Sequence, residues 1–250
     1  MPGPAHRQEV QVWLRTAPWD GLDTAVLDAR ERRRARSFVR PDDGARYAAA
    51  HTALREILGR HLRIPAREVP FERLPCARCG APHGRPVLAA PYAALQFSLS
   101  HSGSMVLIAV STARVGADVQ RIPSAGTVAA CTRALHPEEQ RELAARAGAD
   151  RCRAFARIWT RKEAYLKALG TGLCRPASLD RLGTGTGTGT GPGAGGNGGG
   201  PRGWSFFDLP CGPGHSAAVA VRGTGVGPPV LRRLPHPAYP HSVDREGVSP

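Results

Sequence analysis

Hydrophobic residues follow two different periods in the N-terminal half of the chain. Apolar and polar residues alternate over positions 10–14, which predicts a short strand with one buried face. Between positions 47 and 62 the apolar residues recur every three or four places, the spacing of an amphipathic helix. Three later apolar segments predict further strands: 95–100, 106–111 and 115–122. We therefore expect a sheet with a long helix packed on it.

The C-terminal half combines a long helix with strands in the same way. The Pro-Glu-Glu sequence at 137–139 predicts a helix start, because Pro fits the first turn and acidic side chains favour the positive end of the helix dipole. A longer helix is predicted at about 150–169, and Gly170 follows where a C-terminal cap is expected. Two more strands are predicted at 204–209 and 215–222.

These elements predict an α+β fold with a pseudo-twofold repeat: two similar subdomains, each a small, mainly antiparallel sheet packed with a long helix. We place the N-terminal subdomain at residues 1–112 and the C-terminal subdomain at residues 113–225. Within the second, residues 183–203 are mostly Gly and Thr and predict a flexible loop. The Pro-rich residues 226–250 predict a disordered tail.

Composition sets broad limits on location and partners. The chain has 250 residues, 41% of them hydrophobic, enough for a packed core. No secretory signal and no apolar run of about 20 residues is visible, so we expect a cytoplasmic protein whose six cysteines are mostly reduced thiols. A net charge of +14 favours partners that carry phosphates or carboxylates. Much of this charge is Arg in an Ala-, Gly- and Pro-rich composition, so charge alone identifies no partner.

Two segments carry residues suited to chemistry. FSLSHSG at 97–103 leads into a strand where Asp118 stands among small and apolar residues. A buried carboxylate is costly unless it is paired or bound to a metal, so Asp118 is a candidate metal ligand. In WTRKEAYLKALGTG, Glu163 precedes Lys167 by four residues on one helix face, where an acid and a base could hold a metal and a phosphate together.

An ordinary structural role is the alternative for both segments. An Asp near a strand end is often a turn or cap residue, and a Glu–Lys pair four residues apart is usually a solvated ion pair worth about 0.2–0.5 kcal/mol. The pattern alone favours this alternative.

At these positions the sequence resembles the 4′-phosphopantetheinyl transferases, in particular the larger monomeric type that activates peptide and polyketide synthases. The family's two signatures are a G-x-D strand and a W-x-x-K-E-x-x-x-K helix, which read here as Gly116–Asp118 and Trp159–Lys167. The two signatures are separated by about 45 residues, and His101 precedes Asp118 by 17 residues, as in the family. The resemblance covers roughly residues 10–222, apart from the Gly-rich loop.

The resemblance implies an enzyme that moves 4′-phosphopantetheine from coenzyme A to a serine of an apo acyl or peptidyl carrier protein and releases 3′,5′-ADP. The carrier would belong to a polyketide, nonribosomal peptide or fatty acid synthase. It also implies that Asp118 and Glu163 bind Mg²⁺ beside the coenzyme A pyrophosphate, in a cleft between the two subdomains. A hard cation on oxygen ligands suits phosphoryl transfer, which depends mainly on charge neutralisation and positioning.

The same resemblance assigns roles to further residues. Glu163 could accept the proton of the attacking serine, while Lys167 and His101 would contact phosphate groups, so these three are the expected catalytic residues. Lys162 also belongs to the signature, and we expect it to contact phosphate or to order Glu163. The expected coenzyme A contacts are Arg34, Arg46, Arg85, Ser100, His101, Lys162 and Lys167.

Gln120 departs from the family pattern, because many members have a second acid two residues after the strand Asp. Its amide oxygen could accept a hydrogen bond from metal-bound water but supplies no charge, so we expect Gln120 to contribute weakly to the metal site. An inactive homologue that binds carrier proteins is therefore one alternative, although intact Asp118, Glu163 and Lys167 argue against it.

A basic nucleic-acid-binding protein is the second alternative. The charge supports it, but the chain has only 6% aromatic residues and shows neither a helix-turn-helix nor an RNP-type motif.

Cys76, Cys79 and His83 resemble half of a zinc site. No second CxxC or H-x-H pair supplies the other ligands at normal spacing, so we expect a loop with two reduced thiols rather than a metal site.

Overall fold

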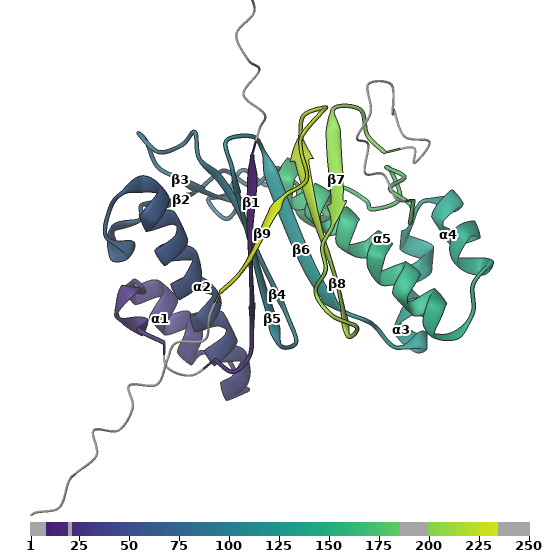
Figure 1. Cartoon of the computed structure of the whole chain (residues 1–250), viewed down its shortest axis with the longest axis horizontal. Helices are drawn as coiled ribbons and strands as arrows, with labels where there is room; N and C mark the ends of the chain where they lie inside the picture. The colour runs from purple at the N-terminus through teal and green to yellow at the C-terminus, as the bar shows by residue number, and fades with distance from the viewer. Residues whose placement is uncertain (1–8, 20–21, 186–199, 235–250) are drawn as a thin grey trace, which may run out of the picture.

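The computed structural model describes residues 9–19, 22–185 and 200–234. In this part of the chain the elements stack as helix, sheet, sheet and helix, with the two sheets in the middle (Figure 1). The predicted α+β class, with small sheets and long helices, is confirmed. No helix within the described residues is long and apolar enough to span a membrane.

The first sheet has the strand order β4-β5-β1-β9. Its members are β1 (Val10–Thr16), β4 (Gln96–Ser102), β5 (Met105–Ser111) and β9 (Val230–Arg233). β5 pairs antiparallel with both β1 and β4, whereas β9 pairs parallel with β1. β4 alternates between apolar and polar residues, whereas β5 is a continuous apolar run that is buried on both faces.

β9 corrects the prediction of a disordered tail from residue 226. Leu231 stands opposite Val12 and packs against the core. The Pro-rich composition hid this short strand, which is tolerated at the sheet edge because few of its backbone groups need partners. Residues 235–250 of the predicted tail, and 186–199 of the predicted Gly-Thr loop, lie outside the described residues.

Helix α2 (Pro41–Leu62) covers the outer face of the first sheet. It begins with Pro at its first turn and ends at Arg63, whose φ of 58° is left-handed. Its apolar stripe, including Leu54 and Ile57, packs on Phe97 of the sheet. The short helix α1 (Ala29–Arg36) precedes it, and a separate two-stranded sheet, β2 (Phe71–Arg73) and β3 (Pro86–Leu88), follows it.

The second sheet has the order β6-β8-β7 and is antiparallel throughout. Its strands are β6 (Val115–Arg121), β7 (Trp204–Asp208) and β8 (His215–Arg222). Helix α5 (Gly148–Leu169) covers its outer face, with Ala164 and Tyr165 packed against Ala220. The remaining helices are α3 (Ala125–Cys131), α4 (Pro137–Ala144) and the 3-10 turns η1 (Thr24–Val26), η2 (Ala66–Glu68), η3 (Thr132–Ala134) and η4 (Gly172–Cys174).

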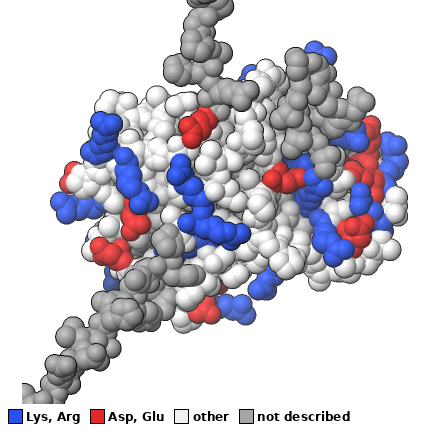
Figure 2. All heavy atoms as spheres, in the orientation of Figure 1, with Lys and Arg blue, Asp and Glu red and all other residues white. Residues whose placement is uncertain are grey.

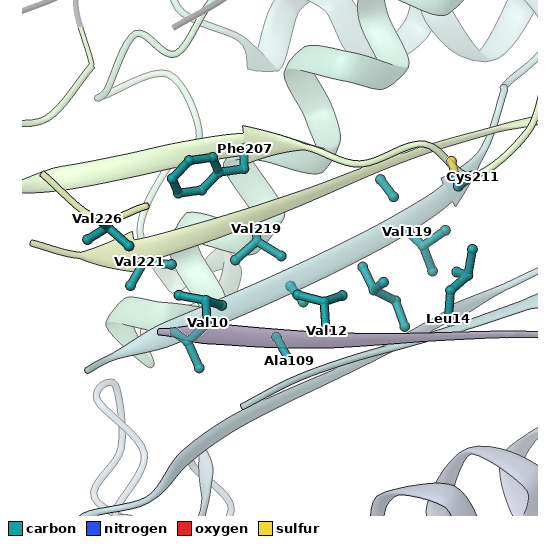
Figure 3. Packing of buried hydrophobic residues seen from close by; sticks show 14 of the residues in the cluster. Val10, Val12, Leu14, Ala109, Val119, Phe207, Cys211, Val219, Val221 and Val226 are labelled. Carbon is teal, nitrogen blue, oxygen red and sulfur yellow. The ribbon is translucent and has the colours of Figure 1, made fainter. Parts of the chain in front are cut away.

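The largest part of the core lies between the two sheets, where their inner faces meet (Figure 3). Val12 and Leu14 of β1 face Val119 and Val219 of the second sheet, and Phe207 closes the cluster. These side chains are at most 7% exposed. Their burial is the main apolar contribution that holds the halves together.

A row of serine hydroxyls joins the two sheets where β4 lies beside β6. Side chains on one face of a strand are two residues apart, so three serines of β4 can each reach the backbone of β6. The hydrogen bonds run from the amides of Ala117, Val119 and Arg121 to the Oγ atoms of Ser98, Ser100 and Ser102, at 2.9, 3.3 and 3.0 Å. We call this row the serine seam. It fixes the register of the two strands that carry the predicted motifs.

Candidate active site

Asp118 lies in the middle of the serine seam, on the face of β6 that packs against α5. It is 1% exposed. Its Oδ1 accepts hydrogen bonds from Ser100 Oγ at 2.7 Å and from Lys167 Nζ at 2.6 Å. Its Oδ2 is buried and has no hydrogen-bond partner among the described residues. Burial raises the pKa of Asp118, and the Lys167 ammonium opposes that effect. A buried carboxylate oxygen without a partner is a strong candidate for binding a cation.

Gly116 explains why helix α5 can bring its side chains to Asp118. A Cβ atom at this position would stand 2.6 Å from the backbone nitrogen of Ala168 and would also meet the Ala164 carbonyl. Only glycine therefore allows α5 to pack this closely on β6. The glycine of the G-x-D signature thus positions the helix, and the aspartate two residues later faces it.

Glu163 lies one helical turn before Lys167 and is half-buried. Its pKa is raised, first by burial and then by the negative charge of Asp118, while the Lys167 ammonium lowers it. The two carboxylates are therefore close enough to repel each other. Such a pair, flanked by an ammonium, can either share a proton or bind a divalent cation through oxygen ligands.

Gln120 shares the strand face of Asp118, because side chains two residues apart point to the same side of a strand. Its Oε1 lies 3.5 Å from the hydroxyl of Ser102, which can donate to it. The amide therefore adds an oxygen but no charge to the two carboxylates.

His101 points to the other side of β4, toward helix α2. Burial lowers its pKa to about 4, and the positive charges of Arg46, His51 and Lys167 add to the shift. The imidazole is therefore neutral at neutral pH and can act as a hydrogen-bond donor without a charge.

A basic groove runs along the outer side of β4. Two pockets of about 720 and 660 Å³ share the lining residues His51, Arg73, Pro86, Phe97 and Leu99, so they form one continuous groove. Arg34 lines one end and Arg85 and Lys167 line the other. Neither Asp118 nor Glu163 lines these two pockets, but Lys167 connects the groove to Asp118 through its 2.6 Å ion pair.

Of the three predicted phosphate-binding arginines, Arg34 and Arg85 line this groove, whereas Arg46 lines neither of its two pockets. Arg85 is bound to the end of α5, because its guanidinium donates to the Ala168 carbonyl at 3.1 Å and to Gln96 Oε1 at 3.0 Å. Arg46 donates to the Gly103 carbonyl at 3.0 Å, near His101. Arg34 is exposed, and its guanidinium lies 4.7 Å from the ring centre of Phe38.

Comparisons with known proteins show which family the chain belongs to. Residues 16–113 match the 4′-phosphopantetheinyl transferase N-terminal domain, and residues 114–220 match the 4′-phosphopantetheinyl transferase superfamily. The chain is 31% identical over 205 residues to the 4′-phosphopantetheinyl transferase HetI of Nostoc, covering 80% of this chain and 81% of that protein. The chain belongs to the 4′-phosphopantetheinyl transferase superfamily.

Other relatives of this superfamily cover less of the chain. A phosphopantetheinyl transferase of Thraustochytrium is 30% identical over an alignment of 185 residues that covers 66% of this chain and 62% of that protein. A 4′-phosphopantetheinyl transferase of Bacillus subtilis is 24% identical over 152 residues, which are 61% of this chain and 64% of that protein. The predicted family, of the larger type, is confirmed.

Lys162 does not line the groove, although a phosphate-binding role was expected for it. Its ammonium is bound to Glu139 Oε2 at 2.7 Å and donates to the carbonyls of Ala177 and Asp180 at 2.7 and 2.6 Å. An ammonium has three N–H donors, so these partners use all of them. The structure corrects the expected role: Lys162 stabilises the packing of α5 against α4 and the chain that follows, not a phosphate or Glu163.

Two polar residues that line both parts of the groove, His51 and Arg73, were not among the predicted site residues. His51 stacks on Tyr47 with 4.1 Å between ring centres and lies 3.1 Å from Glu31 Oε1. The spacing of Tyr47 and His51, four residues apart on one helix, was the available signal. Arg73 lies in a three-residue strand that has no recognisable period.

Proposed function

We propose that the protein transfers the 4′-phosphopantetheine group of coenzyme A to a serine of an apo acyl or peptidyl carrier protein. The observation that carries this proposal is Asp118, whose buried Oδ2 has no partner among the described residues while Glu163 and Lys167 lie beside it. Lys167 connects this constellation to one end of a basic groove, in a member of the 4′-phosphopantetheinyl transferase superfamily.

The groove suits a ligand that is long and carries several phosphates. Its two parts are together large enough for a nucleotide-sized ligand, and their shared wall includes the apolar residues Phe97 and Leu99. Arginines stand at both ends, and a guanidinium can hold a phosphate with two hydrogen bonds. In the proposed complex Arg85 and Lys167 contact the pyrophosphate end of coenzyme A, and Arg34 contacts the far end.

The acidic residues fit a Mg²⁺ ion. Asp118 Oδ2 and the Glu163 carboxylate would hold it, with Gln120 contributing through its neutral oxygen or a water molecule. When bound, the ion would neutralise charge on the pyrophosphate oxygens. Since only two of these three groups are anionic, we expect weaker binding than at a site with three carboxylates.

In the proposed complex, side chains around the reacting phosphate accept the serine proton and stabilise the negative charge. Glu163 accepts the proton of the attacking serine hydroxyl, a task that its raised pKa favours near neutral pH. Lys167 offsets negative charge on the phosphate, and neutral His101 donates a hydrogen bond. The serine oxygen forms a bond to the phosphorus that bears pantetheine, and 3′,5′-ADP leaves. Ser100 keeps Asp118 in place.

The charge of the molecule fits an acidic protein partner. The net charge is +14, and on the face shown in Figure 2 basic side chains lie over the α1–α2 end, the centre and the α4–α5 end, with acidic groups interspersed at both ends. A carrier protein with an acidic helix would be attracted by this surface, and the attraction would weaken with salt. Because acidic side chains are interspersed among the basic ones, this face is not the continuous basic surface that favours nucleic acid.

The test is the intact mass of an apo carrier protein after incubation with this protein, coenzyme A and Mg²⁺, with and without EDTA. We expect a phosphopantetheine adduct on one serine, formed only with the metal. Asp118→Asn and Glu163→Gln should each lower the rate by at least about 100-fold, because each removes a charge from the reacting centre. Glu56→Gln is the matched control, since Glu56 is an exposed acid on α2.

Two outcomes would overturn the proposal. No adduct on several unrelated carriers, from a sample with native circular dichroism, would make the protein an inactive carrier-binding homologue. Full activity of the Asp118→Asn or the Glu163→Gln variant would show that the substituted residue is not required for the transfer.

A further inference from the structure

A cluster of possible metal ligands lies outside the phosphate-binding machinery, in the loop between β2 and β3. Its members are Cys76, Cys79 and His83. Their ligand atoms all lie within 4.8 Å of one another, and Cys79 Sγ is 3.1 Å from His83 Nε2. The sequence suggested only half of a zinc site, but the fold brings all three side chains together.

We propose that Cys76, Cys79 and His83 bind one Zn²⁺ ion. Two thiolates and an imidazole are typical zinc ligands, whereas Mg²⁺ and Ca²⁺ prefer oxygen. Tetrahedral zinc places two ligand sulfur atoms about 3.8 Å apart, and a sulfur and an imidazole nitrogen about 3.6 Å apart. The observed separations match these values after side-chain shifts of less than about 1 Å.

The backbone of the loop is already folded into the form that the site requires. The Cys76 amide donates to the Ala81 carbonyl at 2.8 Å, and the Gly80 amide donates to the Cys76 carbonyl at 2.9 Å. Gly80 has a φ of 72°, which a residue with a side chain rarely adopts. A tight turn therefore carries the two cysteines on one side, and His83 returns toward them. The ion would add a crosslink to a preformed loop.

Two of the three proposed ligands lie at the wall of the groove. Cys76 and His83 both line the pocket that contains Arg85 and Lys167. Three protein ligands leave one tetrahedral position for water, which is the arrangement of an open rather than a closed zinc site. Cys174 lines the same pocket but does not belong to the ligand cluster.

The site would fix one wall of the groove. Directly outside the cluster, the Leu74 amide donates to the Arg85 carbonyl at 3.0 Å and the Gly84 amide donates to the Leu74 carbonyl at 2.9 Å. Arg85 is thus two residues from a ligand and within the same hydrogen-bonded loop. A zinc crosslink between Cys76, Cys79 and His83 would hold the backbone from which Arg85 projects.

The experiment is metal analysis of the full-length protein, purified without chelator and with excess zinc removed by gel filtration. We expect about one zinc ion per chain by inductively coupled plasma mass spectrometry. Cys76→Ser, Cys79→Ser and His83→Ala should each reduce it to a small fraction. Cobalt substitution should give thiolate charge-transfer absorption and intense visible bands, the sign of tetrahedral coordination, and both should be lost in the same variants.

Cys174→Ser and Cys131→Ser are the matched controls and should keep the metal. A metal-free protein, or one whose intact mass shows a Cys76–Cys79 disulfide, would overturn the proposal. So would zinc that is retained in the three ligand variants, or lost in Cys174→Ser, because the ion would then have other ligands. Since each readout is metal content or absorption, the result does not depend on the proposed transferase activity.

Discussion

Two lysines of one helical signature differ completely in their surroundings. Lys162 is 3% exposed at its side chain and is bound to Glu139, whereas Lys167 is 31% exposed and bound to Asp118. Burial lowers the pKa of Lys162, and the Glu139 carboxylate opposes this effect. Five residues separate the two, so they point to different sides of α5. One lysine therefore belongs to the interior and the other to the groove.

The two lysines should respond to substitution in opposite ways. Lys162→Met leaves the Glu139 charge buried without its cation, so we expect a loss of about 3 kcal/mol in the free energy of unfolding. Lys167→Met should reduce transfer by at least about 100-fold. It also leaves buried Asp118 without its cation, but the raised pKa of Asp118 allows that carboxyl to take up a proton, so we expect a smaller loss of stability. Urea denaturation and carrier-protein mass analysis measure the two effects. An inactive but fully stable Lys162→Met variant would restore the phosphate role first expected of Lys162.

His101 should make the protein less stable in mild acid. Its pKa is about 4 in the folded chain, below the usual value of about 6.5, so between these values the unfolded chain binds a proton that the folded chain excludes. Stability is therefore lost as pH falls from about 6.5 toward 4. His101→Gln should lose less stability than the original protein between pH 7 and pH 5, as measured by urea denaturation. The exposed His61→Gln is the control, and equal losses in all three proteins would contradict the prediction.

At this scale the sequence predicts residue types better than residue partners. Asp118 could be singled out because an acid among small and apolar residues needs compensation. Its partner Lys167, and the buried place of Lys162, depend on which side of α5 faces β6, and no local pattern contains that information. The same limit applies to Cys76, Cys79 and His83, whose convergence results from the turn at Gly80.

At the scale of elements, the site depends on the close packing of α5 on β6. Gly116 allows this contact because a side chain there would overlap the α5 backbone. The serine seam aligns β4 with β6, so that Ser100 stands beside Asp118. Helix and strand must therefore keep both their separation and their register for the acids and Lys167 to meet.

Gly116→Ala should separate these elements. The added methyl group would force α5 away from β6, and overpacking of this kind costs about 1–3 kcal/mol of stability. Transfer activity should fall more than stability, because displacement of Glu163 and Lys167 by even about 1 Å is costly for catalysis. The control is Gly126→Ala in α3, where among the described residues a Cβ would meet only Ser124 Oγ, at 3.9 Å. Equal denaturation midpoints and activities for both variants would contradict this role of Gly116.

Long elements were predictable because their periods extend over many residues. The helix predicted at 150–169 begins at Gly148 and ends at Leu169, and the strand predicted at 115–122 is Val115–Arg121. The three-residue strands β2 and β3 are too short for a period to show. The serine seam was not predicted either, because alternating serines within a strand give no indication of a second strand beside them.

At the scale of the whole molecule, the chain crosses between its halves. The first sheet contains β1, β4 and β5 from the N-terminal part, and then β9 returns to it after the second sheet is complete. The predicted subdomain boundary near residue 112 therefore separates the two sheets, except that β9 belongs to the first sheet although it follows the second in sequence. Composition could not reveal β9, because a parallel edge strand of four residues is stabilised by its tertiary contact with β1.

Removal of β9 should weaken the first sheet and, through it, both halves. A chain that ends at Pro229 keeps the buried Val226 but lacks the parallel pairing with β1 and the packing of Leu231, whereas a chain that ends at Leu234 keeps all three. Without β9 the backbone of β1 becomes an unpaired edge, which also favours association between chains. We expect the shorter chain to melt at a lower temperature and to show larger species in light scattering. Equal melting temperatures for the two chains would mean that β9 does not contribute to the stability of the sheet.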